Sequence, residues 1–177
     1  MRTWLRIVVS APFAVASLAA CGGTTASPTP TVVAGLDPCV VGTWKSTGVH
    51  GTVSNADGSI HIPLSGGAGE VAVIRRDGTV ALDYSGAQPQ QGNGTDGGNY
   101  SITVVGQLNG RLRTSAGQAT LDISDRTAAT QTISKDGVVL QRINPPAEQV
   151  STYTCSARSK LTVTTSGITT EWTPSSG

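Results

Sequence analysis

The stretch DPCVVGTWKSTG, residues 37–48, decides how the rest of the chain is interpreted. It places Trp44 two residues after Gly42 and five after Cys39, in a chain that has only three tryptophans and one phenylalanine. Two interpretations are open at this point. Trp44 is either an ordinary core residue of some β fold, or Gly42-x-Trp44 marks the first strand of a particular kind of barrel.

Residues 1–20 have the order of an export signal: positive charge at Arg2 and Arg6, then an apolar run, then small residues. The apolar run over 7–20 is too short for a comfortable membrane span. The tetrapeptide Leu-Ala-Ala-Cys at 18–21 resembles the lipobox of bacterial lipoproteins. The resemblance implies cleavage before Cys21, acylation of its sulfur, and a stable anchor on the outer face of the cell membrane. A plain secretory signal that happens to precede a cysteine is the alternative.

Residues 21–38 are expected to be a flexible tether, because Gly, Ser, Thr and Pro dominate them and Asp37 is their only charge. Residues 39–177 are the length of one domain. Without residues 1–20 the chain has ten basic and eleven acidic residues, a net charge of −1. That balance provides no basic field for nucleic acid and no polybasic membrane patch.

Cys39 and Cys155 remain after Cys21 is assigned to the lipid. In an exported protein two such thiols are expected to form a disulfide, here linking the two ends of the domain. Two buried free thiols are the alternative. A redox-active pair is not expected, because the chain has no C-x-x-C.

The domain is expected to be all-β. Apolar and polar residues alternate at 79–84, 100–104, 119–123 and 161–164, which is the period of strands with one buried face. Four Asx-Gly pairs, at 57–58, 77–78, 109–110 and 136–137, predict hairpin turns between strands. Residues 127–134 fit either a short helix or an edge strand, and residues 86–99 are expected to form a long irregular loop.

These patterns predict an antiparallel up-and-down β-barrel of about eight to ten strands, because closure removes the sheet edges and brings the first and last strands together. A β-sandwich is the alternative. Gly42-x-Trp44 resembles the G-x-W of lipocalins and related calycins, and CVVGTW, YTCSARSKLTVTT and TEW together resemble small lipocalin-like domains of bacterial lipoproteins. This resemblance implies that Trp44 closes one end of the barrel. It also implies a cation packed on Trp44, which Arg142, Arg158 or Lys160 would have to supply.

The sequence contains no recognisable catalytic set, so we do not expect an enzyme, a metal or a cofactor. His50 and His61 match no zinc spacing and are interpreted as exposed strand residues. GAGEVA at 67–72 precedes a strand and is interpreted as a turn rather than a nucleotide-binding loop. A single glycine-rich copy at 92–99 lacks the stacked neighbour that a calcium repeat needs. Glu70, Glu148 and Glu171 are expected to be solvated charges.

The leading hypothesis for function is a cell-envelope lipoprotein that binds a small hydrophobic or amphiphilic ligand inside the barrel. It rests on the resemblance and on the scarcity of bulky side chains, which favours an open apolar interior. The alternative is an envelope structural or interaction protein with a packed barrel and no ligand; its protein partner is unknown. The candidate ligand contacts are the inward-facing Val80, Leu82, Tyr84, Tyr100, Ile102, Val104 and Leu121.

Overall fold

The computed structural model describes residues 35–175, so the predicted signal, Cys21 and most of the predicted tether lie outside the described residues. In the part that is described, no helix is long and apolar enough to cross a membrane. All regular elements there are strands. They are β1 (Gly42–Ser54), β2 (His61–Gly66), β3 (Val71–Ile74), β4 (Thr79–Asp83), β5 (Gln90–Asn93), β6 (Asn99–Ser115), β7 (Gln118–Ile123), β8 (Ala129–Lys135), β9 (Val138–Ile143), β10 (Glu148–Ser156), β11 (Lys160–Thr165) and β12 (Ile168–Pro174).

The strands form one antiparallel, barrel-like sheet, which confirms the predicted fold class. Eight of them close a ring of hydrogen-bonded neighbours in the order β1, β3, β4, β6, β7, β10, β11, β12 and back to β1. The sheet has twelve strands, more than the eight to ten that were expected. The additional strands, β2, β5, β8 and β9, extend the sheet beyond the ring.

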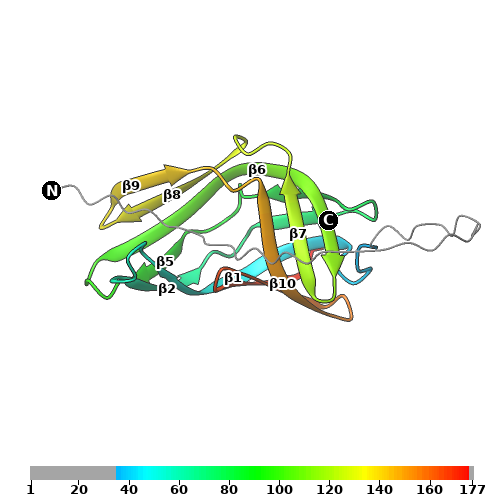
Figure 1. The fold of residues 1–177 in the computed structure, drawn as a ribbon, viewed down its shortest axis with the longest axis horizontal. Helices are drawn as coiled ribbons and strands as arrows, with labels where there is room; N and C mark the ends of the chain where they lie inside the picture. Colours follow the sequence, from blue (N-terminus) through cyan, green and yellow to red (C-terminus); the bar gives the residue numbers. More distant parts are fainter. Residues whose placement is uncertain (1–34, 176–177) are drawn as a thin grey trace, which may run out of the picture.

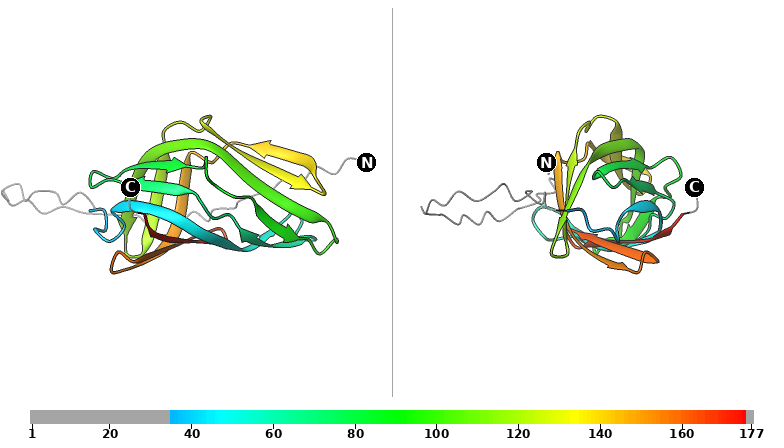
Figure 2. Two further views of the ribbon diagram at one scale, coloured as in Figure 1. Left: turned by 180° about the vertical axis from the view of Figure 1, so that it is seen from behind. Right: turned by 90° about the vertical axis from the view of Figure 1, so that its right-hand side faces the viewer.

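β1 and β6 run along the length of the molecule and belong to both of its parts (Figures 1 and 2). The first residues of β1 pair with β3, and the later ones, from Val49 to Ser54, pair with β2. A bulge between Ser46 and Gly48 lies where the partner changes, as expected because a bulge bends a strand and increases its twist. The final part of β6 pairs with β4 and β7, and its first part with β5 and β8.

These changes of partner divide the molecule into two halves. We call the eight-stranded ring the closed half. We call β2, β5, β8 and β9, with the adjoining parts of β1 and β6, the open half. In the open half β9 pairs with β8 alone, and among the described strands none pairs with its other edge.

The structure differs from, or decides between, the sequence-based expectations at three places. Asn109-Gly110 is not a turn: it lies inside β6, where a Cβ on Gly110 would come 2.3 Å from the carbonyl oxygen of Asp122. The glycine therefore allows close strand approach and does not reverse the chain. The predicted loop at 86–99 contains β5, which was missed because its sequence QQGN shows no apolar alternation. Residues 129–135 form a strand, not a helix.

The core of the closed half is built around Trp44, whose exposed fraction is 2%. Its indole N–H donates to the carbonyl oxygen of Val40 at 2.8 Å. The side chains packed with it are contributed by β3, β4, β11 and β12 as well as by the segment before β1: Val40, Ala72, Ile74, Val80, Leu161 and Trp172. Trp44 thus lies at the centre of the ring's packing. The role of Gly42 and Trp44 in a lipocalin-type closure stays a prediction.

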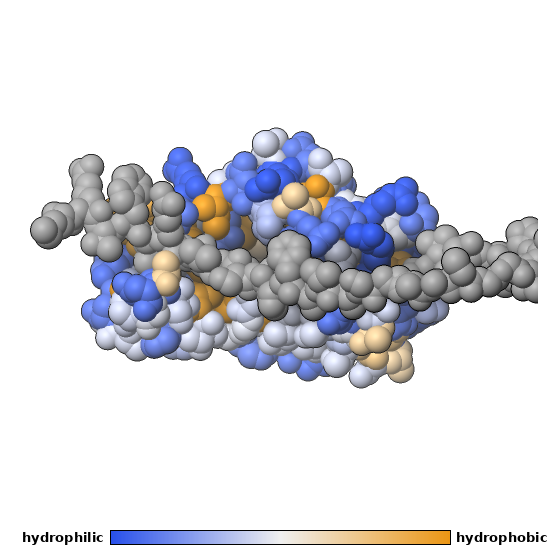
Figure 3. Space-filling view, viewed as in Figure 1, coloured by the Kyte–Doolittle hydropathy of each residue, from blue (hydrophilic) through white to orange (hydrophobic). Residues whose placement is uncertain are grey.

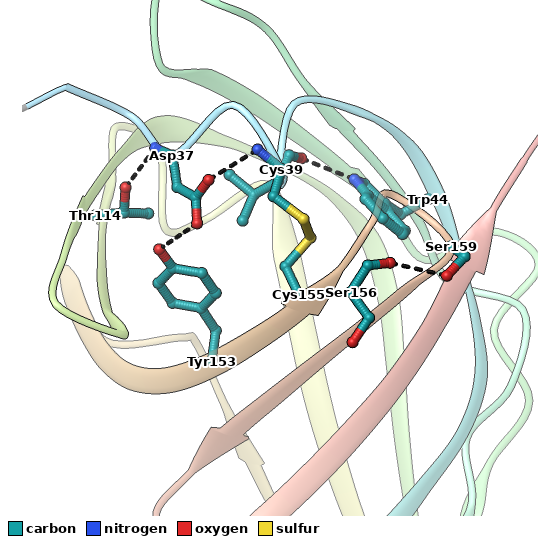
Figure 4. The surroundings of a disulfide bond; sticks show 9 residues. Asp37, Cys39, Trp44, Thr114, Tyr153, Cys155, Ser156 and Ser159 are labelled. Carbon is teal, nitrogen blue, oxygen red and sulfur yellow. Dashed lines mark hydrogen bonds between the residues drawn. A yellow bond between two sulfur atoms is a disulfide. The ribbon is translucent and has the colours of Figure 1, made fainter.

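The predicted disulfide between Cys39 and Cys155 is present, with a Cα–Cα distance of 6.0 Å (Figure 4). Asp37 also holds this segment against the fold, through hydrogen bonds. Its carboxylate accepts hydrogen bonds from the backbone N–H of Cys39 at 2.8 Å and from the hydroxyl of Tyr153 at 2.9 Å. Its own N–H donates to Thr114 Oγ1 at 2.7 Å. The last residues of the range expected to be tether therefore contact the fold.

Candidate functional site

His50 and His61 are the two histidines of the described part, and they lie on neighbouring strands, β1 and β2. His61 Nδ1 is hydrogen-bonded to Ser54 Oγ at 2.8 Å on the exposed surface, and His50 is exposed on β1. Over residues 35–175 no group of three His, Cys, Asp or Glu side chains is placed to hold a metal ion.

The seven predicted ligand contacts are divided between the two halves. Val80, Leu82 and Leu121 belong to the packing around Trp44, and Tyr84 packs against the cluster of Leu108, Ile123 and Ala129. Tyr100 and Ile102 belong to a separate cluster in the open half. Val104 is half-buried on β6, two residues further along. They do not line one common pocket, and ligand contact by any of them stays a prediction.

The open half has a shallow apolar groove. It is lined by Val53, Ile60, Ile62, Tyr100, Ile102 and Ile133, with Ser54 and Asn55 at its rim. Its volume is about 20 Å³, which suffices for one water molecule but is far below the several hundred Å³ of typical ligand pockets. The side chains of the open half thus largely fill the space between its strands.

A second hollow, of about 510 Å³, lies beside the start of the described chain and is open to solvent. Leu36, Pro38 and Val41 provide apolar walls, and the exposed Arg76 and Arg158 provide positive charge. Neither guanidinium takes part in an ion pair within residues 35–175. This hollow lies next to the disulfide end of the barrel, where the tether joins the fold.

The glycine-rich segment at 92–99 is held by protein groups. Asp96 Oδ2 accepts hydrogen bonds from the Tyr100 hydroxyl and from Lys135 Nζ, each at 2.8 Å. The ammonium of Lys135 also lies 5.7 Å from the centre of the Tyr100 ring. The hydrogen bond from Lys135 lowers the pKa of Asp96 to about 2. The carboxylate of Asp96 is therefore ionised, and it is paired with the ammonium of Lys135. Where an aromatic–cation contact occurs in the described part, it involves Lys135 and Tyr100 and not Trp44.

Glu70 departs from the expectation of a solvated charge. It precedes β3 and alternates with the buried Ala72 and Ile74, so its side chain is directed to the same inner face. Its backbone is fixed opposite Ser46 by two hydrogen bonds, of 2.8 and 2.9 Å. By surface area the residue as a whole is half-buried, yet its carboxyl group is surrounded by protein. This desolvation raises the pKa of Glu70 to about 7, and a hydrogen bond from Tyr84 opposes the rise.

We expect Glu70 to make the protein less stable as pH rises. The unfolded chain releases this proton near pH 4.5, whereas the folded protein retains it until about pH 7. The free energy of unfolding should therefore fall between these two values, by on the order of 2–3 kcal/mol. Glu70→Gln should flatten this part of the profile. Denaturant unfolding of both proteins at a series of pH values measures the effect. Parallel profiles would show that the pKa of Glu70 is the same in the folded and unfolded states.

The feature of the open half that sequence reasoning missed is the free edge of β9. Val138, Val139 and Leu140 are consecutive, and their exposed fractions are 65%, 48% and 46%. Figure 3 shows apolar surface, in orange, at the left end of the molecule around the β8–β9 hairpin. Val105 and Val150 are also exposed, but they lie singly in β6 and β10, strands that pair with neighbours on both sides. Asp136-Gly137 signals the hairpin, but nothing in the sequence shows that the second strand of that hairpin lacks a further neighbour.

Comparison with known proteins gives this chain no relative: no family model, no curated protein and no solved structure matches it. The function of this protein must therefore be inferred from its own residues.

Proposed function

We propose that this protein is an exported bacterial lipoprotein, anchored through Cys21 to the outer face of the cell membrane, whose barrel acts by binding another protein at its open half. The anchor is supported by the charged, apolar and small-residue order of residues 1–21. The disulfide between Cys39 and Cys155 fits an oxidising compartment outside the cytoplasm.

The contrast between the barrel interior and the β9 edge carries the proposal. The apolar groove between the strands of the open half has room for about one water molecule. The edge of β9 instead leaves backbone groups and three aliphatic side chains facing solvent. Exposed apolar edges promote pairing with another chain, and natural sheets usually protect them with charge, proline or bulges. β9 has no proline or lysine, and its protective features are Arg142 and a bulge at Leu140. The rest of its free edge is a docking surface for an extended segment.

Site-specific photo-crosslinking in the bacterial host tests this function. A photoreactive side chain at Leu140 should give a discrete protein adduct on illumination, because Leu140 would lie in the interface. The control is Val150, which is somewhat more exposed than Leu140 and pairs with Thr120 of β7, in a strand that also pairs with β11 from Thr152 onward. The adduct should be found in the membrane fraction and move to the soluble fraction in Cys21→Ala. Equal or absent adducts at the two positions would contradict the proposal.

A second candidate is the binding of a slender apolar or amphiphilic ligand along the groove of the open half. The observation in its favour is the lining, in which six of the eight residues are apolar or aromatic. A single acyl chain lying across Val53 and Ile60 would fit this surface better than a compact ligand would. Lipid that co-purifies with the protein and is lost in Ile60→Asp would support this function. It would do so whatever the crosslinking result.

A further inference from the structure

The β9 edge has a property beyond exposure: its charges are arranged symmetrically. Asp136 and Arg142 lie three residues before and three residues after Val139. Both are exposed, and within the described residues neither takes part in an ion pair. One carboxylate oxygen of Asp136 accepts the backbone N–H of Asn99, the first residue of β6, at 2.9 Å, which holds the carboxylate at the β8–β9 turn.

This arrangement is complementary to itself in the antiparallel direction. If two β9 strands pair about Val139, Val139 meets its own copy and Val138 meets Leu140 on each side of the axis. The same register brings Asp136, in the hairpin turn before β9, near Arg142 of the other chain, twice. Residues directly opposite in an antiparallel pair share a face and are close enough for apolar and ionic contact. A two-fold axis requires this kind of self-complementary patch.

We propose that β9 is the contact between two copies of this chain, joined edge to edge about a two-fold axis at Val139. This inference rests on the proposed function, since it names the partner that the open half binds. Pairing would join the two β8–β9 hairpins into a four-stranded antiparallel sheet. It would provide hydrogen-bond partners for the backbone groups on the free edge of β9, which in the described chain have no strand to pair with. The aliphatic side chains would be covered in the same step.

Few features of the edge oppose this pairing. Across β9, VVLQRI, there is no proline and no lysine, and Arg142 is the only charged residue. Leu140 is the extra residue of a bulge in β9, because Ile133 pairs with Gln141 and Ser134 with Val139. The bulge interrupts the alternation of side chains at Leu140. Val138 and Val139 still pair in register with Lys135 and Ser134, and they continue the ladder up to the turn.

Sedimentation equilibrium of the full chain, purified with its disulfide intact, tests the inference. The wild type should form a reversible dimer. Arg142→Glu should raise the dissociation constant at least about tenfold, because it sets two like charges opposite each other at both ends of the contact. Arg142→Lys should retain the dimer. Val150→Glu is the control: it places a glutamate at an exposed aliphatic position away from the edge, and it should leave the dissociation constant unchanged.

A symmetric crosslink identifies the register. In a Cys21→Ser background, Val139→Cys should form an intermolecular disulfide at the axis, and Val105→Cys should not. A chain that stays monomeric across the accessible concentrations, or a dimer that is equally sensitive to Arg142→Glu and Val150→Glu, would overturn the inference. If Leu140 crosslinks in cells to a different protein, the partner is not a second copy but the docking function holds. If Leu140 gives no adduct at all, the docking function fails as well.

Discussion

Trp44→Ala should lower the free energy of unfolding by about 3–5 kcal/mol, the usual loss when a buried tryptophan or phenylalanine is truncated in a core. Trp44 is 2% exposed and packs with side chains from β3 and β4 on one side of β1 in the ring and from β11 and β12 on the other. The substitution removes this packing and also leaves the carbonyl oxygen of Val40 without the indole N–H that it accepts at 2.8 Å. Denaturant unfolding followed by circular dichroism measures the loss.

Two other variants show whether the loss is specific to this position. Trp172 is also buried, but its indole nitrogen has no hydrogen-bond partner among the described residues, so Trp172→Phe should cost less than Trp44→Phe. Val150→Ala, at an exposed position, should change stability by less than about 1 kcal/mol. A loss of only that size for Trp44→Ala would mean that the tryptophan does not support the ring.

Removing the disulfide with the double substitution of Cys39 and Cys155 by serine should cost about 4–5 kcal/mol on the chain-entropy model. The bond closes a loop across a sequence separation of 116 residues, so it restricts the unfolded chain strongly. The melting temperature should fall by roughly 10–20 °C. Calorimetry of the oxidised wild type and the double variant measures both quantities.

The hydrogen bonds of Asp37 bear on how much stability is lost when the disulfide is removed. Its hydrogen bonds to Cys39, Tyr153 and Thr114 hold the same segment in the folded state without the disulfide. We therefore expect the double variant to fold, with lower stability and an unchanged far-ultraviolet spectrum. An unchanged melting temperature would show that these contacts and the packing of Val40 are sufficient, and that the disulfide adds no stability.

The all-β class and the disulfide could be predicted because each depends on simple features of the sequence. Alternation marks half-buried strands such as that at Val80 and Leu82, and two thiols in an exported chain leave one pairing. β5 could not be found in this way. Its residues pair with β2 and β6 through the backbone, and backbone hydrogen bonds leave no side-chain pattern.

The features that bear on function were the hardest to predict, because they depend on neighbours that are distant in sequence. Glu70 resembles any polar turn residue until its position opposite Ser46 directs it inward. β9 resembles any other strand after an Asp-Gly turn until the sheet leaves its second edge without a partner. The division into two halves likewise depends on relative strand lengths, because β1 and β6 extend beyond the ends of the strands with which they first pair.

The position at which the chain joins the fold sets how the protein would be oriented at the cell surface. Residue 35 lies at the closed half, and β9 lies at the opposite end of the long axis (Figures 1 and 2). If Cys21 is held in the membrane, the fourteen residues from there to Gly35 reach at most about 50 Å. A single copy can then stand upright with β9 directed away from the lipid. Two copies joined through β9 have their tethers at opposite ends. If both are anchored in one membrane, the long axis of the pair would have to lie parallel to the membrane surface.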